Sequence, residues 1–104
     1  MSITPQGGLT FTIATGGVPV QVIPPGVSGG YIVNPFSAAD QGFSGSTAPE
    51  NLVVDPVNPP SLVGNNTSTT IGPGQSYTAL TNSTLGLWVN AATGGHKITV
   101  VYWL

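Results

Sequence analysis

Apolar and polar residues alternate along several short stretches of this chain, with the period of two residues that is typical of β-strands. The alternation is clean over Leu9–Ala14, and it is strongest in the last twenty or so residues, Leu85–Leu104. Two arms rich in β-branched and aromatic residues flank Ala91–Gly95 there, and this link ends in a glycine pair. We therefore predict that Leu85–Leu104 forms a β-hairpin around which the remaining strands are organised.

Five further stretches have the composition of strands and end at residues that form turns. They are Val18–Ile23, Gly29–Asn34, Asn51–Asp55, Thr67–Ile71 and Ser76–Leu80. Pro19 places the first of them at a sheet edge or beside a bulge, because proline lacks the amide hydrogen that a strand ladder needs. Fifteen glycines and ten prolines would interrupt helices almost everywhere.

The pattern predicts an all-β chain of about eight short strands. We expect a two-sheet antiparallel β-sandwich, of jelly-roll or immunoglobulin-like Greek-key type. Residues 9–104 would form this single domain, and residues 1–8, which contain a proline and a glycine pair, a flexible N-terminal arm.

Pro35–Pro49 is a long connection without periodicity, rich in serine, alanine and glycine. Connections of this length in compact domains are usually functional or disordered. Its two aromatic residues, Phe36 and Phe43, either tuck under the sandwich or contact a partner, and the sequence leaves both readings open.

The closing segment predicts a second apolar surface. Alternate residues of the return arm share a face, with Ile98, Val100 and Tyr102 on one side and Lys97, Thr99, Val101 and Trp103 on the other. The second face starts polar and ends apolar, so it needs cover that one sheet does not supply. The candidate interface residues are Phe36, Phe43, Trp88, Val101 and Trp103, with Trp103 as the strongest anchor.

Charge is unusually scarce, at 4% of residues and a formal net charge of -2. One cation gives no electrostatic basis for binding nucleic acid or an anionic membrane. With little like-charge repulsion to keep copies apart, we expect self-association as a homo-oligomer, a dimer or a trimer. The chain has no cysteine, and its start lacks the basic and apolar regions of a signal peptide.

The residues that carry most enzyme chemistry are few. His96 follows a glycine pair and is expected to be a solvent-facing turn residue, while Asp40, Glu50 and Asp55 read as surface or turn residues. No serine lies in a nucleophile-elbow sequence, and the histidine and carboxylates do not have the spacing of metal ligands. We predict no catalytic, metal-binding or cofactor-binding residue and no enzymatic activity.

The aromatic residues offer one alternative. Trp88, Trp103, Tyr31, Tyr77 and Tyr102 could form a sugar-stacking platform, as in carbohydrate-binding modules. Packing in the core and at interfaces is the plainer expectation for them.

Four segments carry a resemblance to a known class of proteins. They are Tyr31–Pro35 with Asp40–Gly42 after it, Glu50–Pro56, Ile71–Tyr77, and Trp88–Lys97 running on to Val100–Trp103. They resemble small virion structural proteins of tailed bacteriophages, in particular short β-sandwich capsid decoration or cement proteins. The resemblance implies a protein made in the cytoplasm of a host bacterium, which binds the major capsid protein on the capsid surface and stabilises the assembled head shell.

Two other roles remain open. One is a receptor-binding, tail fibre or spike component of the same virion, with a β-sandwich that binds carbohydrate. The other is a carbohydrate-binding module of a cellular protein.

Overall fold

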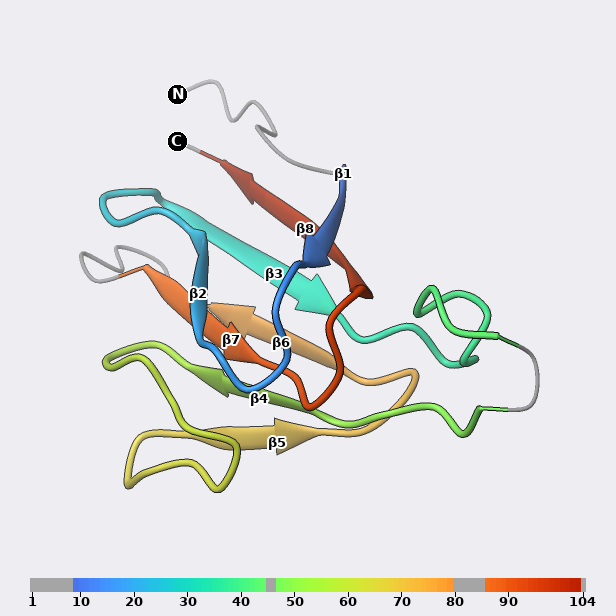
Figure 1. Ribbon diagram of the computed structural model, residues 1–104. Helices are drawn as coiled ribbons and strands as arrows, with labels where there is room; N and C mark the ends of the chain where they lie inside the picture. Colours follow the sequence, from blue (N-terminus) through green and yellow to red (C-terminus); the bar gives the residue numbers. More distant parts are fainter. Residues whose placement is uncertain (1–8, 45–46, 80–85, 104) are drawn as a thin grey trace.

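The computed structural model describes residues 9–44, 47–79 and 86–103, and these residues form eight strands and no helix (Figure 1). The strands are β1 (Leu9–Ile13), β2 (Val20–Ile23), β3 (Gly29–Val33), β4 (Leu52–Asp55), β5 (Thr69–Ile71), β6 (Ser76–Ala79), β7 (Leu87–Asn90) and β8 (His96–Trp103). The predicted flexible arm, residues 1–8, lies outside the described residues.

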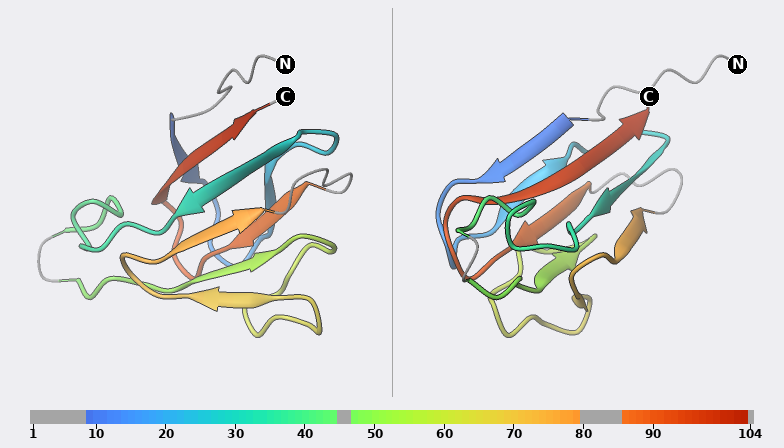
Figure 2. Two further views of the ribbon diagram at one scale, coloured as in Figure 1. Left: turned by 180° about the vertical axis from the view of Figure 1, so that it is seen from behind. Right: turned by 90° about the vertical axis from the view of Figure 1, so that its right-hand side faces the viewer.

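The strands form two four-stranded sheets that pack as two layers (Figure 2). One sheet has the order β1-β8-β3-β6 and the other the order β2-β7-β4-β5, and every pairing is antiparallel. The predicted all-β, two-sheet antiparallel architecture is therefore confirmed. β2 lies at a sheet edge with a register shift after Gln21, as Pro19 indicated.

The predicted closing hairpin is wrong. β7 pairs with β2 and β4, whereas β8 pairs with β1 and β3, so the two arms belong to different sheets. Each arm has an apolar inner face, with Leu87 and Val89 on one and Ile98 and Val100 on the other. Placed in opposite sheets, the two faces meet across the core and bury each other, which a hairpin within one sheet would not allow.

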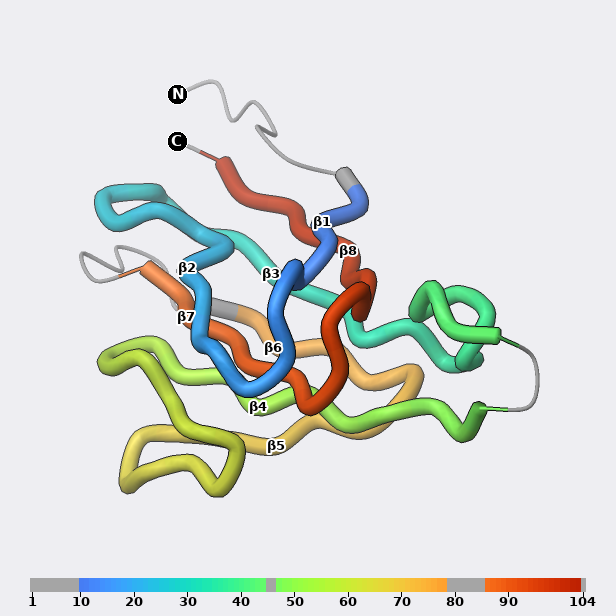
Figure 3. The backbone as a smooth tube through the Cα atoms, viewed as in Figure 1, coloured from blue at the N-terminus to red at the C-terminus, as the bar shows by residue number. Residues whose placement is uncertain are grey.

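Two connections cross between the sheets side by side, one from β1 to β2 and the other from β7 to β8 (Figure 3). The Gly17 amide donates to the Ala91 carbonyl at 2.8 Å, and the Gly95 amide donates to the Ile13 carbonyl, also at 2.8 Å. The backbones approach so closely that a Cβ on Gly16 would lie 2.3 Å from the Ala92 carbonyl oxygen. Glycine at position 16 therefore permits the double crossing.

Aliphatic side chains from both sheets form one core between the layers. The buried members are Ile13, Val22, Ile23, Val27, Ile32, Leu52, Val54, Ile71, Leu87, Val89, Ala91, Ile98 and Val100. Phe11, Val20, Tyr77 and Tyr102 pack against this cluster. Burial of this apolar surface is the main force holding the two sheets together.

The outer faces of the two sheets differ. On the β2-β7-β4-β5 sheet, Val53 and Asp55 point away from the core yet are buried, at 7% and 0% exposure. The β4–β5 connection covers them, and the Asn90 side-chain amide donates to the Pro60 carbonyl of this connection at 2.8 Å. The outer face of the other sheet has no such cover from the described residues.

Candidate functional site

Buried polar side chains gather at the end of the sandwich where the β3–β4 connection begins and ends. Asn34, Gln41 and His96 are fully buried there, and the Glu50 side chain is 22% exposed. His96 begins β8, Asn34 follows β3, and Glu50 precedes β4. Residues from both ends and the middle of the β3–β4 connection thus meet the start of β8 in one cluster, which we call the polar cluster.

Asn34 fixes the orientation of the cluster. Its Nδ2 donates to the carbonyl oxygens of Glu50, at 2.9 Å, and Ile71, at 3.4 Å. Its Oδ1 therefore faces Gln41 Nε2 at 3.1 Å and His96 Nε2 at 2.8 Å. Because Oδ1 is an acceptor, His96 Nε2 carries the hydrogen.

Gln41 holds the β3–β4 connection to the sandwich. Its Nε2 lies 2.9 Å from the Pro35 carbonyl and 3.0 Å from the Glu50 carbonyl, and its Oε1 accepts from the Glu50 amide at 2.8 Å. Its own carbonyl accepts from the Lys97 amide of β8 at 2.9 Å. The middle of the connection is therefore bonded to both of its ends and to β8.

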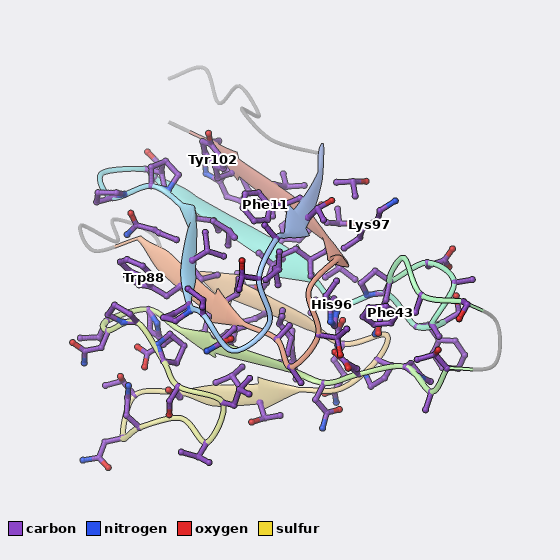
Figure 4. The ribbon with its side chains drawn as sticks, viewed as in Figure 1. Phe11, Phe43, Trp88, His96, Lys97 and Tyr102 are labelled. Atoms are coloured by element: carbon purple, nitrogen blue, oxygen red, sulfur yellow. The ribbon has the colours of Figure 1, made fainter. Side chains whose placement is uncertain are left out.

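His96 is buried, so the prediction of a solvent-facing turn histidine is wrong. Its Nδ1 faces Glu50 Oε1 at 3.5 Å and makes no hydrogen bond, and the Phe43 ring packs edge-on against the imidazole at 5.5 Å between centroids (Figure 4). Burial lowers the pKa of His96 below its usual value, and the nearby Glu50 carboxylate opposes this shift only in part. Nδ1 is therefore the one ring nitrogen without a hydrogen-bond partner.

The cluster also reaches the β7–β8 connection. Glu50 accepts from the Thr93 amide at 3.2 Å and from the Thr93 hydroxyl, which joins the β7–β8 connection to the cluster. Among the described residues, the polar side chains that face the imidazole are Asn34 and Glu50. Within residues 9–44, 47–79 and 86–103, no group of three or more His, Cys, Asp or Glu residues is placed to hold a metal ion.

A buried carboxylate, that of Asp55, anchors the β4–β5 connection. Asp55 is fully buried, and its Oδ1 accepts from the Val57 amide at 2.8 Å and the Asn58 amide at 2.9 Å. The hydroxyls of Thr67, at 2.7 Å, and Ser68, at 2.8 Å, reach its Oδ2. Burial raises the pKa of Asp55, but these hydrogen bonds outweigh it and lower the pKa to about 2. The prediction of a surface residue is wrong for Asp55, although it does begin a turn.

The five candidate interface residues occupy three places. Phe36 is 77% exposed on the β3–β4 connection, whereas Phe43, on the same connection, packs against His96. Trp88 lies on β7, and Val101 and Trp103 lie on β8 in the other sheet. They do not form one continuous surface, and their role at an interface stays a prediction.

The aromatic residues are also dispersed. Tyr77 and Tyr102 pack against the core, so they are not available for a five-membered sugar-stacking platform. Tyr31 is exposed on β3, next to Val101 in the register between β3 and β8. Trp103 pairs with Gly29, where an added Cβ would lie 2.9 Å from its ring, so the indole covers this glycine.

The outer face of the β1-β8-β3-β6 sheet, which no described residue covers, is a further candidate surface. The strand registers bring together on it Thr10, Thr12, Tyr31, Val33, Ser76, Thr78, Lys97, Thr99, Val101 and Trp103. Lys97 alone is charged among these described residues, and it lies at one end beside Asp40. We call this surface the open face.

Sequence reasoning predicted the β8 part of the open face, with Lys97, Thr99, Val101 and Trp103 on one side of the strand, and missed the polar cluster. The local signal for His96 was its place in the alternation of β8, because residues 96, 98 and 100 lie on the inner face of this strand.

No helix of the described residues is long and apolar enough to cross a membrane. Comparisons with protein-family models, with curated proteins and with solved structures found no match to this chain.

Proposed function

We infer that the two sheets form a jelly roll. The support is the nesting of the strand pairs, in which β1 pairs with β8, β2 with β7, β3 with β6 and β4 with β5. The chain thus follows one long hairpin that is folded over into two layers, as two Greek keys require. In an immunoglobulin-like sandwich the first two strands would be neighbours in one sheet, whereas β1 and β2 lie in different sheets.

We propose that this protein is a non-enzymatic virion component of a tailed bacteriophage, a decoration or cement protein that binds the assembled head shell. The observation that carries the proposal is the open face, because it joins exposed Tyr31 and partly exposed Val101 and Trp103 to a surround of hydroxyl groups with little charge. Such a surface is suited to docking by shape and apolar contact. Jelly rolls are also a common architecture of viral capsid domains.

Weak contacts are sufficient for a protein that binds an assembled shell. A protein that binds the assembled shell but not its free subunits stabilises the shell by mass action. If it associates as a dimer or trimer, several weak contacts with the major capsid protein act together and raise the apparent affinity. The capsid surface is therefore the expected location.

The two tryptophans provide a matched test. Trp103→Ala removes an aromatic side chain from the open face, and Trp88→Ala removes one from the other sheet. Cosedimentation with assembled shells of the parent phage should show at least tenfold weaker binding for Trp103→Ala and a much smaller effect for Trp88→Ala. Urea unfolding of both variants provides the stability control. Equal losses of binding for the two variants, or no binding of the wild type to shells, would refute the proposal.

Salt provides an independent check. Ion pairs between surfaces weaken as salt screens them, and the open face offers Lys97 alone. Attachment to shells should therefore change little between low salt and physiological salt. A steep loss of binding with added salt would show that the contact is electrostatic and not the open face.

A further inference from the structure

The edge strand β1 has none of the features that usually block strand pairing. The strands at the edges of the two sheets are β1, β2, β5 and β6, and β1, with five residues, is the longest of them. Proteins commonly protect an edge with a charge, a proline or a bulge, and β2 has a shifted register and follows Pro19. The sequence of β1 is Leu-Thr-Phe-Thr-Ile, without charge or proline, and its register with β8 is regular.

The backbone groups of Thr10 and Thr12 point away from β8. Thr12 lies opposite Lys97 in the register, but the Lys97 amide donates to the Gln41 carbonyl. Opposed residues of an antiparallel pair alternate between those that exchange hydrogen bonds and those that do not. This pair is of the second kind, and so is the pair two positions on, Thr10 and Thr99. No strand among the described residues pairs with the outward side of β1.

We propose that β1 pairs antiparallel with β1 of a second copy of this chain, about a two-fold axis at Phe11. The sequence of β1 is symmetric about this residue, with a threonine on either side and an aliphatic residue at each end. In this register Thr10 lies opposite Thr12 of the other copy, and the outward amide of each donates to the outward carbonyl of the other. The two Phe11 residues oppose each other in a pair without hydrogen bonds, the kind that brings side chains closest. This inference does not rest on the proposed role on a phage shell.

An open apolar groove beside β1 adds apolar contact to the hydrogen bonds. It is lined by residues of β1, of the β1–β2 connection and of β2, among them Phe11, Val18 and Val20. Val18 is 53% exposed. Opposed residues of paired strands share a face of the sheet, so Phe11 of the second copy would lie at the mouth of this groove. Pairing thus buries apolar surface that a single chain leaves in contact with water.

The distribution of charge is compatible with a second copy as the occupant. Lys97 is the single Lys or Arg of the sequence, and it lies beside Thr12. In the joined sheet Thr12 is followed by Thr10 and then Thr99 of the other copy, so the two lysines lie in different rows and do not meet. Like charges, which oppose strand pairing when they lie opposite each other, are therefore absent from the contact between the described strands.

The pairing also determines how the two open faces lie. A two-fold axis at Phe11 runs perpendicular to the sheet, because opposed residues share a face. Both open faces then lie on the same side of one continuous sheet. A target with repeated sites would bind both at once, which raises the apparent affinity without a new contact.

Sedimentation equilibrium of the full chain over a series of concentrations tests the dimer, and a pair of proline variants locates it. The wild type should show a reversible equilibrium between monomer and dimer. Thr12→Pro removes an outward amide that β8 does not use, so it should weaken the dimer by about tenfold or more and leave the chain folded. Thr78→Pro is the matched control at the opposite edge of the same sheet. The Asn34 amide donates to the Gln75 carbonyl, so by the same alternation the Thr78 amide points outward from β6. This variant should leave the dimer unchanged.

Two double variants test the register. Thr10→Glu with Thr12→Glu places like charges opposite each other across the two-fold axis, and it should weaken the dimer by about tenfold or more. Thr10→Lys with Thr12→Glu places opposite charges there, and it should form the dimer at least as tightly as the wild type. Both positions are exposed in the single chain, so both variants should fold.

Amide hydrogen exchange identifies the strand in contact. Protection of the Thr10 and Thr12 amides should rise with protein concentration, whereas that of the Gly17 amide, which donates to the Ala91 carbonyl, should not.

Three results would overturn the pairing at β1. The first is a wild type that stays monomeric over the whole series, with exchange at Thr10 and Thr12 independent of concentration. The second is an equal effect of Thr12→Pro and Thr78→Pro on the dimer. The third is equal behaviour of the two double variants. If Thr12→Pro does not fold, the double variants and the exchange data still decide the question.

Discussion

Replacing Asp55 with asparagine should destabilise the protein substantially, although the side chain keeps its size. Asp55 is fully buried and accepts hydrogen bonds from two backbone amides and two hydroxyls of the β4–β5 connection. An asparagine keeps one acceptor oxygen but turns an NH2 group toward donors. At least one donor then loses its partner, and the β4–β5 connection that covers the outer face of its sheet loosens.

The pKa of Asp55 sets the size of the expected loss of stability. The hydrogen bonds to its carboxylate lower the pKa of Asp55 from its ordinary value of 3.8 to about 2. A shift of this size corresponds to about 2 kcal/mol of stability in favour of the ionised form. Because the folded pKa is the lower one, this stability is present above about pH 4 and is lost as the pH falls toward 2. We expect Asp55→Asn to cost about 2–3 kcal/mol at pH 7.

Urea unfolding at a series of pH values measures both effects. The wild type should lose about 2 kcal/mol between pH 4 and pH 2 through Asp55, and Asp55→Asn should lack this part of the acid dependence. Asp40→Asn is the matched control, because it also removes one carboxylate but from an exposed position. The reasoning fails if Asp55→Asn is as stable as Asp40→Asn at pH 7, or if it retains the acid dependence of the wild type.

Two further predictions concern the backbone crossing and the polar cluster. Gly16→Ala should lower the free energy of unfolding by about 3 kcal/mol, because its Cβ would clash with the Ala92 carbonyl, whereas Gly26→Ala, with φ of 86° and no atom near its Cβ, should cost about 1 kcal/mol. Similar losses for both, measured by thermal unfolding, would argue against the tight crossing. Gln41→Ala should cost about 2–3 kcal/mol because it leaves the Glu50 amide unpaired. Gln75→Ala, at an exposed turn, should cost much less, and equal midpoints in urea would contradict the anchoring role of Gln41.

Strand positions could be predicted from the sequence because each depends on local pattern. The alternation in Leu9–Ile13 and in the return arm, and the proline and glycine punctuation, mark eight strands that the structure also contains. Which strands pair was not predictable in this way. The link Ala91–Gly95 has the composition of a hairpin turn, and only the fit of two apolar faces across the core shows that it crosses between sheets.

The polar cluster was hidden from the sequence for a different reason. Asn34, Gln41 and His96 are buried by contacts between segments as much as 62 residues apart. Taken one at a time, these residues would be expected on the surface, because asparagine, glutamine and histidine are common there. The one local signal was that His96 alternates with Ile98 and so belongs to the same face of the strand. The glycine pair before His96 indicated instead a solvent-exposed turn.

Scarcity of charge and the hydrogen bonding of two carboxylates are connected. The sequence contains four charged residues, and two of them, Glu50 and Asp55, accept hydrogen bonds that fix long connections. Loops rich in proline and glycine cannot satisfy their amides within a strand ladder, so a carboxylate that binds several donors is an effective anchor. This use leaves Asp40 and Lys97 as the exposed charges. Because two of the four charges are used to order loops, few charges remain on the surface to repel another molecule. The open face can therefore approach another molecule closely without separating ion pairs.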